Sequence, residues 1–359
     1  MVTKAGKHTQ GLDRFFASFY GRPGPGLAFF TRSLVRGQQR RSFPLRVEQV
    51  VRSDAEKAAR KAQAARRQQT PSPAKRRPGR PKGSKNTPKA DVTLTPELWR
   101  LTGMLGALRP VIAGGGPLTY GLLDGPCGHH HALQMARQHK LHLLSKLRGD
   151  AALYFPYTGL YAGRGPPRKD GRKVDSDHRP EPYRKETTVE GPIQTRLSQA
   201  QLLHKECAQP LNVVMIAKTN RRPQARAHVI LFSSDLELAY TSLVDYESWR
   251  FQIAFNFRAA KQYWGLEDVM HVTPPGVTNA AHLSLCMVKV AYRLRADGHL
   301  RDPDYSVLDL QADCRAYKYV EETIQMLPEK PEPVLCAKIL NQVAGVGRIH
   351  ASQPSFNFS

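Results

Sequence analysis

Residues 118–147 decide the fold class and read LTYGLLDGPCGHHHALQMARQHKLHLLSKL. The apolar runs Leu118–Leu123 and Leu141–Leu147 predict two strands, and His130–His139 between them predicts a helix. Two more β-rich runs follow at Val213–Ala217 and His228–Phe232. Strands that alternate with helices are typical of an α/β fold, so we expect a mixed sheet flanked by helices.

The segments outside these strands are mainly helical toward the C-terminus. Thr95-Pro96-Glu97 predicts a helix start, because Thr caps well and Pro suits the first helical position. The region 159–183 is rich in Gly, Pro, Arg and Asp and predicts a long loop. Residues 1–50 predict short strands and loops. Helical patterns are found at 236–266, 280–295, 314–325 and 334–343.

The composition favours a polyanionic partner. The 359 residues carry a net charge of +24, and 40% are hydrophobic, which is enough for a core. No window approaches 18 consecutive apolar residues, so we expect no membrane span and a cytoplasmic protein. The five cysteines fit neither a disulfide framework nor a paired zinc site, and we interpret them as reduced thiols.

The positive charge is concentrated in the first 90 residues, which hold 22 Lys or Arg and 4 Asp or Glu. From Ser53 to Ala90 almost nothing is apolar beyond alanine, so this stretch predicts a disordered basic arm whose first half, 54–69, could form a solvated helix. Residues 76–85 resemble an AT-hook with Arg80 in a narrow minor groove, and a solvated linker that binds DNA by counterion release is the alternative. The DNA-binding cations expected here are Arg76, Arg77, Arg80, Lys82 and Lys85.

The stretch 249–268, WRFQIAFNFRAAKQYWGLED, resembles the C-terminal signature of bacterial insertion-sequence transposases of the DDE superfamily. That signature runs Tyr, two residues, Arg, three residues, Glu, six residues, Lys on one amphipathic helix. Arg250 and Lys261 match its two cations, whereas Ala254 stands at the metal-binding Glu and Glu247 at the Tyr. At 3.6 residues per turn, positions 250, 254 and 261 would share one helix face.

A second match concerns the catalytic aspartates. Asp124, at the end of an apolar run and before Gly125, resembles the family's second catalytic Asp, although Cys127 replaces the expected aromatic residue. The first Asp would precede a segment similar to Val2–Lys7, where only Met1 remains. We therefore expect an N-terminally truncated chain.

The resemblance implies a ribonuclease H-like fold that binds Mg²⁺ or Mn²⁺ and cuts and joins transposon DNA. Two Mg²⁺ ions need three carboxylates, and Asp124 alone is too few, so we expect the activity to be lost. Asp124 would be the surviving metal ligand, with Arg250 and Lys261 at the phosphate. We expect truncated N-terminal strands at 1–52 that join the ribonuclease H-like sheet, the arm at 53–92, the rest of the catalytic domain at 93–270 and a helical region at 271–359.

Three functional hypotheses remain open. The first is a DDE transposase with impaired cleavage, bound to double-stranded transposon ends. The second is a non-enzymatic DNA-binding protein that represses or titrates an intact transposase, as a homo-oligomer or in a mixed oligomer with it. The third, a ribosomal or chromatin-like basic protein, is disfavoured because the charge is concentrated in one arm beside a sizeable core.

Other residues have simpler interpretations than chemistry. His129, His130 and His131 are interpreted as surface histidines rather than metal ligands. The aromatic residues at 249, 251, 255 and 257 are interpreted as core, and Asp235 as a helix N-cap.

Overall fold

The computed structural model describes residues 2–4, 8–17, 20–69, 92–112, 114, 116–161, 163, 168–175, 181–222, 224–299 and 302–350. Contacts between residues divide the chain into two compact units. The sheet unit comprises residues 34–46 and 52–252, and the terminal unit comprises 1–33, 47–51 and 253–359. The division into four segments at 1–52, 53–92, 93–270 and 271–359 remains a prediction.

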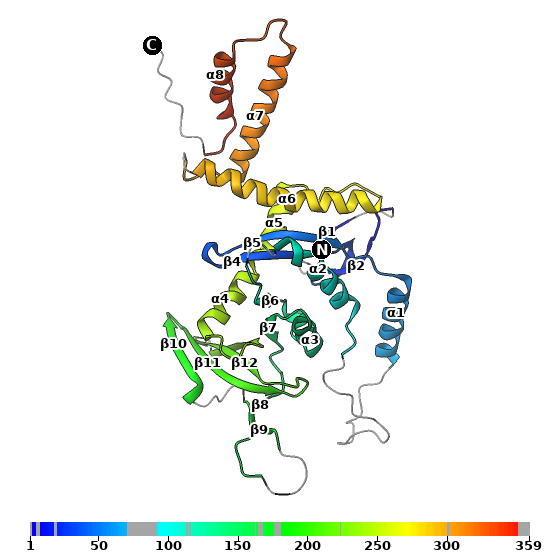
Figure 1. Ribbon diagram of the computed structural model, residues 1–359, viewed down its shortest axis with the longest axis vertical. Coiled ribbons are helices and arrows are strands. Elements are labelled where there is room, and N and C mark those ends of the chain that lie inside the picture. Colours follow the sequence, from blue (N-terminus) through cyan, green and yellow to red (C-terminus); the bar gives the residue numbers. More distant parts are fainter. Residues whose placement is uncertain are drawn as a thin grey trace. The chain divides into compact units, whose positions relative to one another are not determined.

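A mixed sheet of eight strands forms the centre of the sheet unit (Figure 1). The strand order is β6-β7-β13-β12-β11-β8-β9, with β10 paired to β11. Only β6 and β7 are parallel, and all other pairs are antiparallel. The strands are β6 (Tyr120–Leu122), β7 (His142–Leu147), β8 (Leu153–Pro156), β9 (Asp170–Lys173), β10 (Arg184–Glu190), β11 (Ile193–His204), β12 (Leu211–Arg221) and β13 (Gln224–Ser233).

The parallel pair requires a crossover, and the helix α3 (His130–Gln138) provides it. Ala132, Leu133, Met135 and Ala136 of α3 are buried, which fixes the apolar face of that helix against β7. The strand, helix and strand predicted over 118–147 are therefore confirmed. The α/β class with a mixed sheet is confirmed as well.

A core cluster joins the sheet to the helix α4 (Tyr240–Arg250). Val214 of β12 and Leu231 of β13 are opposite one another in the register and pack with Leu243 of α4. Because β12 is central, all five residues from Leu211 to Met215 are buried. The predicted β-runs at 213–217 and 228–232 both lie inside these longer strands.

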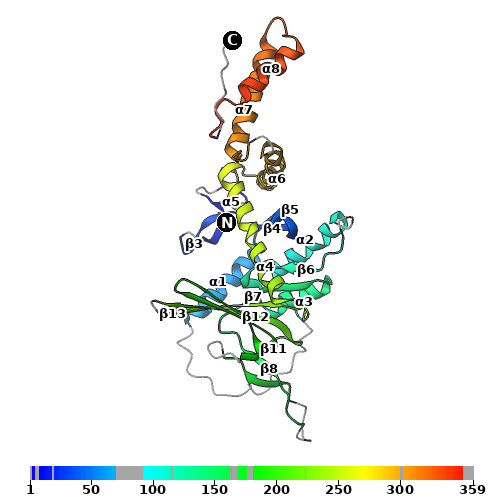
Figure 2. The ribbon, with the colours of Figure 1, turned by 90° about the vertical axis from the view of Figure 1, so that its left-hand side faces the viewer.

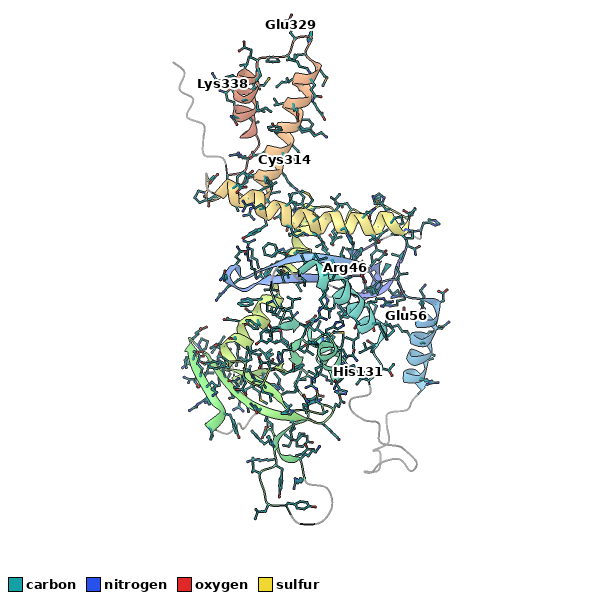
Figure 3. All side chains as sticks on the ribbon, viewed as in Figure 1. Arg46, Glu56, His131, Cys314, Glu329 and Lys338 are labelled. Carbon is teal, nitrogen blue, oxygen red and sulfur yellow. The ribbon has the colours of Figure 1, made fainter. Side chains whose placement is uncertain are left out.

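Two helices precede the sheet in the chain, α1 (Asp54–Gln69) and α2 (Pro96–Ile112). A reciprocal capping box starts α1, since the Ser53 N–H donates to Glu56 at 2.9 Å and the Glu56 N–H donates to the Ser53 hydroxyl at 3.2 Å. Glu56, which Figure 3 labels on α1, also forms an ion pair with Arg100 of α2 at 3.1 Å. The Thr95 hydroxyl caps α2 by accepting the Leu98 N–H at 3.3 Å. Both predicted helix starts are confirmed.

The terminal unit contains short sheets and long helices (Figure 2). The strands β1 (Val2–Thr3), β3 (Arg22–Leu27) and β2 (Asp13–Ala17) form a three-stranded antiparallel sheet in that order. A hairpin of β4 (Phe29–Arg36) and β5 (Arg41–Gln49) is divided between the two units. The helices are α5 (Gln252–Tyr263), α6 (Pro274–His299), α7 (Val307–Met326) and α8 (Pro333–Ala344).

The N-terminal strands pack on helices of their own unit. Val2, Leu27 and Val47 share a buried cluster with Ala260 of α5 and Leu285 of α6. We expected these strands to join the main sheet, and that detail is wrong. Their buried side chains have helical partners instead, and Pro23 and Pro25 leave β3 with fewer backbone donors.

The structure also tests the expected loop at 159–183 and the state of the cysteines. The predicted loop over 159–183 contains the short strand β9 and a 3₁₀ turn at Glu181–Tyr183. None of the five cysteines, all of which lie among the described residues, forms a disulfide, as predicted.

Candidate functional site

Asp124 lies directly after β6 and caps a 3₁₀ turn, Gly125–Cys127. Its Oδ1 accepts the Gly125 N–H at 2.8 Å. The Ser145 hydroxyl of β7 donates to the carbonyl oxygens of Leu123 and Asp124 at 3.0 and 3.2 Å, which holds the strand end in place. A Cβ at Gly128 would overlap the Lys146 carbonyl oxygen, so only glycine permits this close approach to β7.

Four charged side chains from three elements meet beside this turn, and we call them the ion-pair network: Asp124, Arg250, Glu247 and Lys146. The Arg250 Nη1 lies 3.0 Å from Asp124 Oδ1, and its Nε donates to Glu247 Oε1 at 3.0 Å. The Lys146 Nζ lies 3.0 Å from the same Glu247 oxygen. The network is therefore an alternating line of two carboxylates and two cations.

Burial differs sharply along the network. The side chain of Glu247 is 8% exposed and that of Arg250 is 13% exposed, whereas Asp124 is 69% exposed. A carboxylate as buried as Glu247 needs opposite charge beside it, and Arg250 and Lys146 both supply it. Both cations also approach the ring of Phe251, at 4.6 and 4.9 Å from its centre. The cations at this site are thus already neutralised within the sheet unit.

The donor set does not fit a pair of Mg²⁺ ions. Mg²⁺ requires near-octahedral oxygen ligation, and a two-ion site needs several carboxylates around one point. Asp124 Oδ1 already accepts from Gly125 and Arg250, and the bonded Glu247 oxygen faces two cations. In the part of the chain that the structure describes, no three His, Cys, Asp or Glu side chains are grouped to hold a metal.

The signature region is two helices rather than one. α4 ends at Arg250, where the Phe251 N–H bonds to the Ser248 carbonyl at 3.2 Å, and α5 begins at Gln252. Arg250 belongs to the sheet unit, whereas Ala254 and Lys261 belong to the terminal unit. The expectation that all three share one face of one helix is therefore wrong.

The other two signature positions, Ala254 and Lys261, lie in α5. Ala254 is exposed. The Lys261 Nζ forms an ion pair with Glu267 Oε1 at 2.8 Å. Of the predicted cations, the structure brings only Arg250 to Asp124 within the sheet unit.

The aromatic residues near the signature are only partly core. Phe257 packs against the buried cluster of the terminal unit, and Trp249 packs on Tyr246 with ring centres 4.9 Å apart. Phe251 is 48% exposed and Phe255 is 56% exposed, so the core interpretation is wrong for these two. The prediction assumed one continuous helix, whereas the helix ends at Arg250 and a second helix begins at Gln252.

His130 and Asp235 differ from their sequence interpretations. His130 is buried, and His129 caps α3 by accepting the Ala132 N–H at 3.4 Å; burial, with His131 nearby, lowers the pKa of His129. Asp235 is not an N-cap, because Ala239 holds that position in α4. Its carboxylate accepts the Tyr120 hydroxyl at 2.7 Å. Burial, together with this hydrogen bond, raises the pKa of Tyr120 to about 12.

Two members of the ion-pair network were not predicted as site residues. Lys146 is a lone cation within an apolar strand, and Glu247 precedes Arg250 by three residues on one helix. The spacing of Glu247 and Arg250 is a usable signal for an ion pair, because residues three apart on a helix are neighbours. The arm residues at 76, 77, 80, 82 and 85 lie outside the described residues.

The mixed sheet, the crossover from β6 to β7 and an acidic residue at the end of β6 are consistent with a ribonuclease H-like α/β protein. The model of a protein family described as DDE superfamily endonuclease matches residues 1–207, which is more than half of the chain. The chain therefore belongs to the DDE superfamily endonuclease family. No curated protein matches it.

Membership implies DNA as the substrate class and divalent metal ions as the usual cofactor of the family. The matched residues include Asp124 but end before the 249–268 stretch. Among the described helices, none is long and apolar enough to cross a membrane.

Proposed function

We propose that this protein is a DDE-type transposase of insertion-sequence origin that binds transposon DNA and whose strand cleavage and strand transfer are disabled. The observation that carries the proposal is the ion pair between Asp124 and Arg250 at 3.0 Å, beside the buried pairs of Glu247. In this arrangement the acidic residue at the strand end is compensated by protein cations.

Charge supports the DNA-binding half of the proposal. The excess of 18 positive charges in residues 1–90 favours a polyanion, and family membership identifies DNA as that polyanion. Arg76, Arg77, Arg80, Lys82 and Lys85 would supply phosphate and minor-groove contacts. A minor-groove hook and counterion release by a basic linker use the same side chains.

The loss of cleavage follows from the residues at the site. Asp124 is the one carboxylate available at the expected position, and position 254 carries Ala. Lys146 and Arg250 would have to leave buried Glu247 in order to meet a phosphate, which leaves an uncompensated buried charge. Mg²⁺ or Mn²⁺ is the cofactor implied by the family, and these residues do not form its site.

A second function is favoured by the same network. A protein that occupies transposon ends without cutting them would repress or titrate an intact transposase, alone or in a mixed oligomer. The self-compensated network at Asp124 suits this role, because it requires no metal and leaves the fold complete.

One assay tests both halves of the proposal. Purified protein is mixed with DNA that carries its own gene and flanks, and binding and Mg²⁺- or Mn²⁺-dependent nicking are scored together across salt concentrations. We expect salt-sensitive binding without nicking, also for Ala254→Glu. Metal-dependent nicking that Asp124→Ala abolishes would contradict the loss of cleavage, and absence of binding would contradict the whole proposal.

A further inference from the structure

Three long strands of the main sheet form a surface with an unusual charge content. β11, β12 and β13 together contain 33 residues and no Asp or Glu. They carry four cations, Arg196, Lys218, Arg221 and Arg226, all exposed. Strands that carry cations and no carboxylate of their own favour an anionic partner.

The register separates these cations onto two faces of the sheet. Val214 and Ile216 of β12 face α4 in the core, so the alternation along the strand places Lys218 on that face as well. Arg221 is an odd number of residues from Lys218 in the same strand, so its side chain lies on the opposite face of the sheet. In β13, Leu231 faces α4, so Arg226 lies on the opposite face.

Arg196 joins Arg221 and Arg226 on the second face. Gln199 of β11 is paired with Val214, which places residue 199 on the α4 side and residue 196 on the other side. We call Arg196, Arg221 and Arg226 the arginine face. The α4 side differs, because there Lys218 is accompanied by Glu186 and Glu190 of β10, which are paired with residues 197 and 193.

The pairing also fixes the spacing of the arginine face. Arg196 is opposite Ala217, which lies two residues before Thr219, and Thr219 is opposite Arg226. Arg221 follows two residues after Thr219 in β12. With strands about 4.8 Å apart and alternate residues about 7 Å apart, the three Cα atoms span roughly 10 by 14 Å. The small side chains of Ala217 and Thr219 lie between them.

We infer that the arginine face is a second DNA-binding surface, which contacts the phosphates of double-stranded DNA independently of the basic arm. The inference rests on the proposed function for the identity of the polyanion. Guanidinium groups match phosphate oxygens in planar, two-pronged hydrogen bonds, and arginines on strands are held at fixed spacing. Such contacts position the duplex without reading its sequence.

The experiment compares three variants of the full chain with the wild type. The arginine-face variant is Arg196→Gln, Arg221→Gln and Arg226→Gln. The matched control, Lys318→Gln, Lys330→Gln and Lys338→Gln, removes the same charge from exposed positions in α7, the following turn and α8, where Figure 3 labels Lys338. The arm variant changes Arg76, Arg77, Arg80, Lys82 and Lys85 to Gln. All are titrated against a short fluorescent duplex of random sequence over a range of salt.

We expect the arginine-face variant to bind roughly tenfold to a hundredfold more weakly, with the slope of log K against log salt smaller by about 2 to 3. The control should stay within about threefold of wild type, since exposed charges that make no phosphate contact act on DNA only through attraction that salt screens. Far-UV circular dichroism verifies that each variant is folded.

Three outcomes separate the hypotheses. If the arginine-face variant binds like the control while the arm variant loses binding, the arginine face is a solvated surface and the inference is wrong, while the proposed function stands. If wild-type protein does not bind the duplex, the proposed function itself fails. An additive loss in the arm and arginine-face variants supports two independent surfaces.

Discussion

Arg250 lies between two carboxylates, with Nη1 3.0 Å from Asp124 and Nε 3.0 Å from Glu247. The same residue is one of the two cations that match the family signature. Its partner in that signature, Lys261, instead pairs with Glu267. Arg250 therefore pairs with a buried carboxylate and Lys261 with a half-exposed one, so their removal should change the stability of the protein by different amounts.

Arg250→Ala should lower the free energy of unfolding by about 3 kcal/mol, because it leaves the buried carboxylate of Glu247 with Lys146 alone. Urea denaturation followed by circular dichroism measures the change. Lys261→Ala is the control and should cost less than about 1 kcal/mol, because Glu267 is half exposed. Equal losses in the two variants would show that the network contributes no more than a surface ion pair.

Gly128→Ala should destabilise the sheet unit by more than about 2 kcal/mol, because the new Cβ would overlap the Lys146 carbonyl oxygen. The shift in thermal midpoint reports the effect. Gly106→Ala in α2 is the matched control, since no heavy atom lies within 4 Å of its Cβ position. We expect a gain of up to about 1 kcal/mol there from helix propensity. A neutral Gly128→Ala would exclude the close approach of the turn to β7.

Glu56→Ala should fray the start of α1, because it removes half of the capping box and the ion pair to Arg100. The expected cost is about 1 kcal/mol, measured as faster amide hydrogen exchange over residues 54–58. The backbone hydrogen bond from Ser53 lowers the pKa of Glu56 below its ordinary 4.5. Its contribution is therefore present above that value and is lost as the pH falls through the lowered pKa.

Asp54→Ala is the control for this prediction, because the Asp54 side chain is fully exposed. Exchange at residues 54–58 should stay close to that of the wild type in this variant. Equal fraying in both variants would mean that loss of negative charge at the helix start, rather than the capping box, is the cause.

The segment 348–350 should release from α7 as the pH rises. The His350 Nδ1 lies 3.0 Å from Asp309 Oδ2, and this hydrogen bond raises the pKa of His350 above 6.5. Burial alone would raise the pKa of Asp309, but hydrogen bonds from Ser306 and His350 outweigh it and lower that pKa. A group with a raised folded pKa stabilises fully below its unfolded value and loses this effect above the folded one. Amide exchange at Ile349 and His350, followed from pH 6 to 9, measures the release.

Asp309→Asn supplies the comparison for the pH series. In that variant the protection of Ile349 and His350 should be weaker and should show no loss as the pH rises, because the Asn amide oxygen can still accept both N–H groups but carries no charge to hold protonated His350. A pH-independent protection in the wild-type protein would contradict the role of the His350 charge.

Much of the fold could be predicted because its elements have local signals. The strand, helix and strand over 118–147 and the helix start at Thr95 follow from apolar runs and a capping residue. The strand β11 was missed because its residues, IQTRLSQAQLLH, are largely polar and its partners are distant in sequence. Strand pairing of this kind depends on tertiary context rather than on local propensity.

Only part of the candidate site could be predicted from the sequence. Asp124 and Arg250 could be selected because the residues around them resemble motifs of the family, and the structure brings the two side chains together. The periodicity of 236–266 gave no sign of the interruption at Phe251, because the residues on both sides are compatible with a helix. The pairing of Lys146 with Glu247 joins residues 101 positions apart, which no local pattern reveals.

The interruption at Phe251 has a consequence for any attempt to restore the site by mutation. Ala254 belongs to the terminal unit, whereas Asp124 and Arg250 belong to the sheet unit. A glutamate introduced at position 254 would stand on a different helix from Arg250, and Lys146 and Arg250 would still pair with buried Glu247. On the proposed function, repair of the site is therefore not a single-residue problem, because the pairs around Glu247 would have to be rebuilt as well.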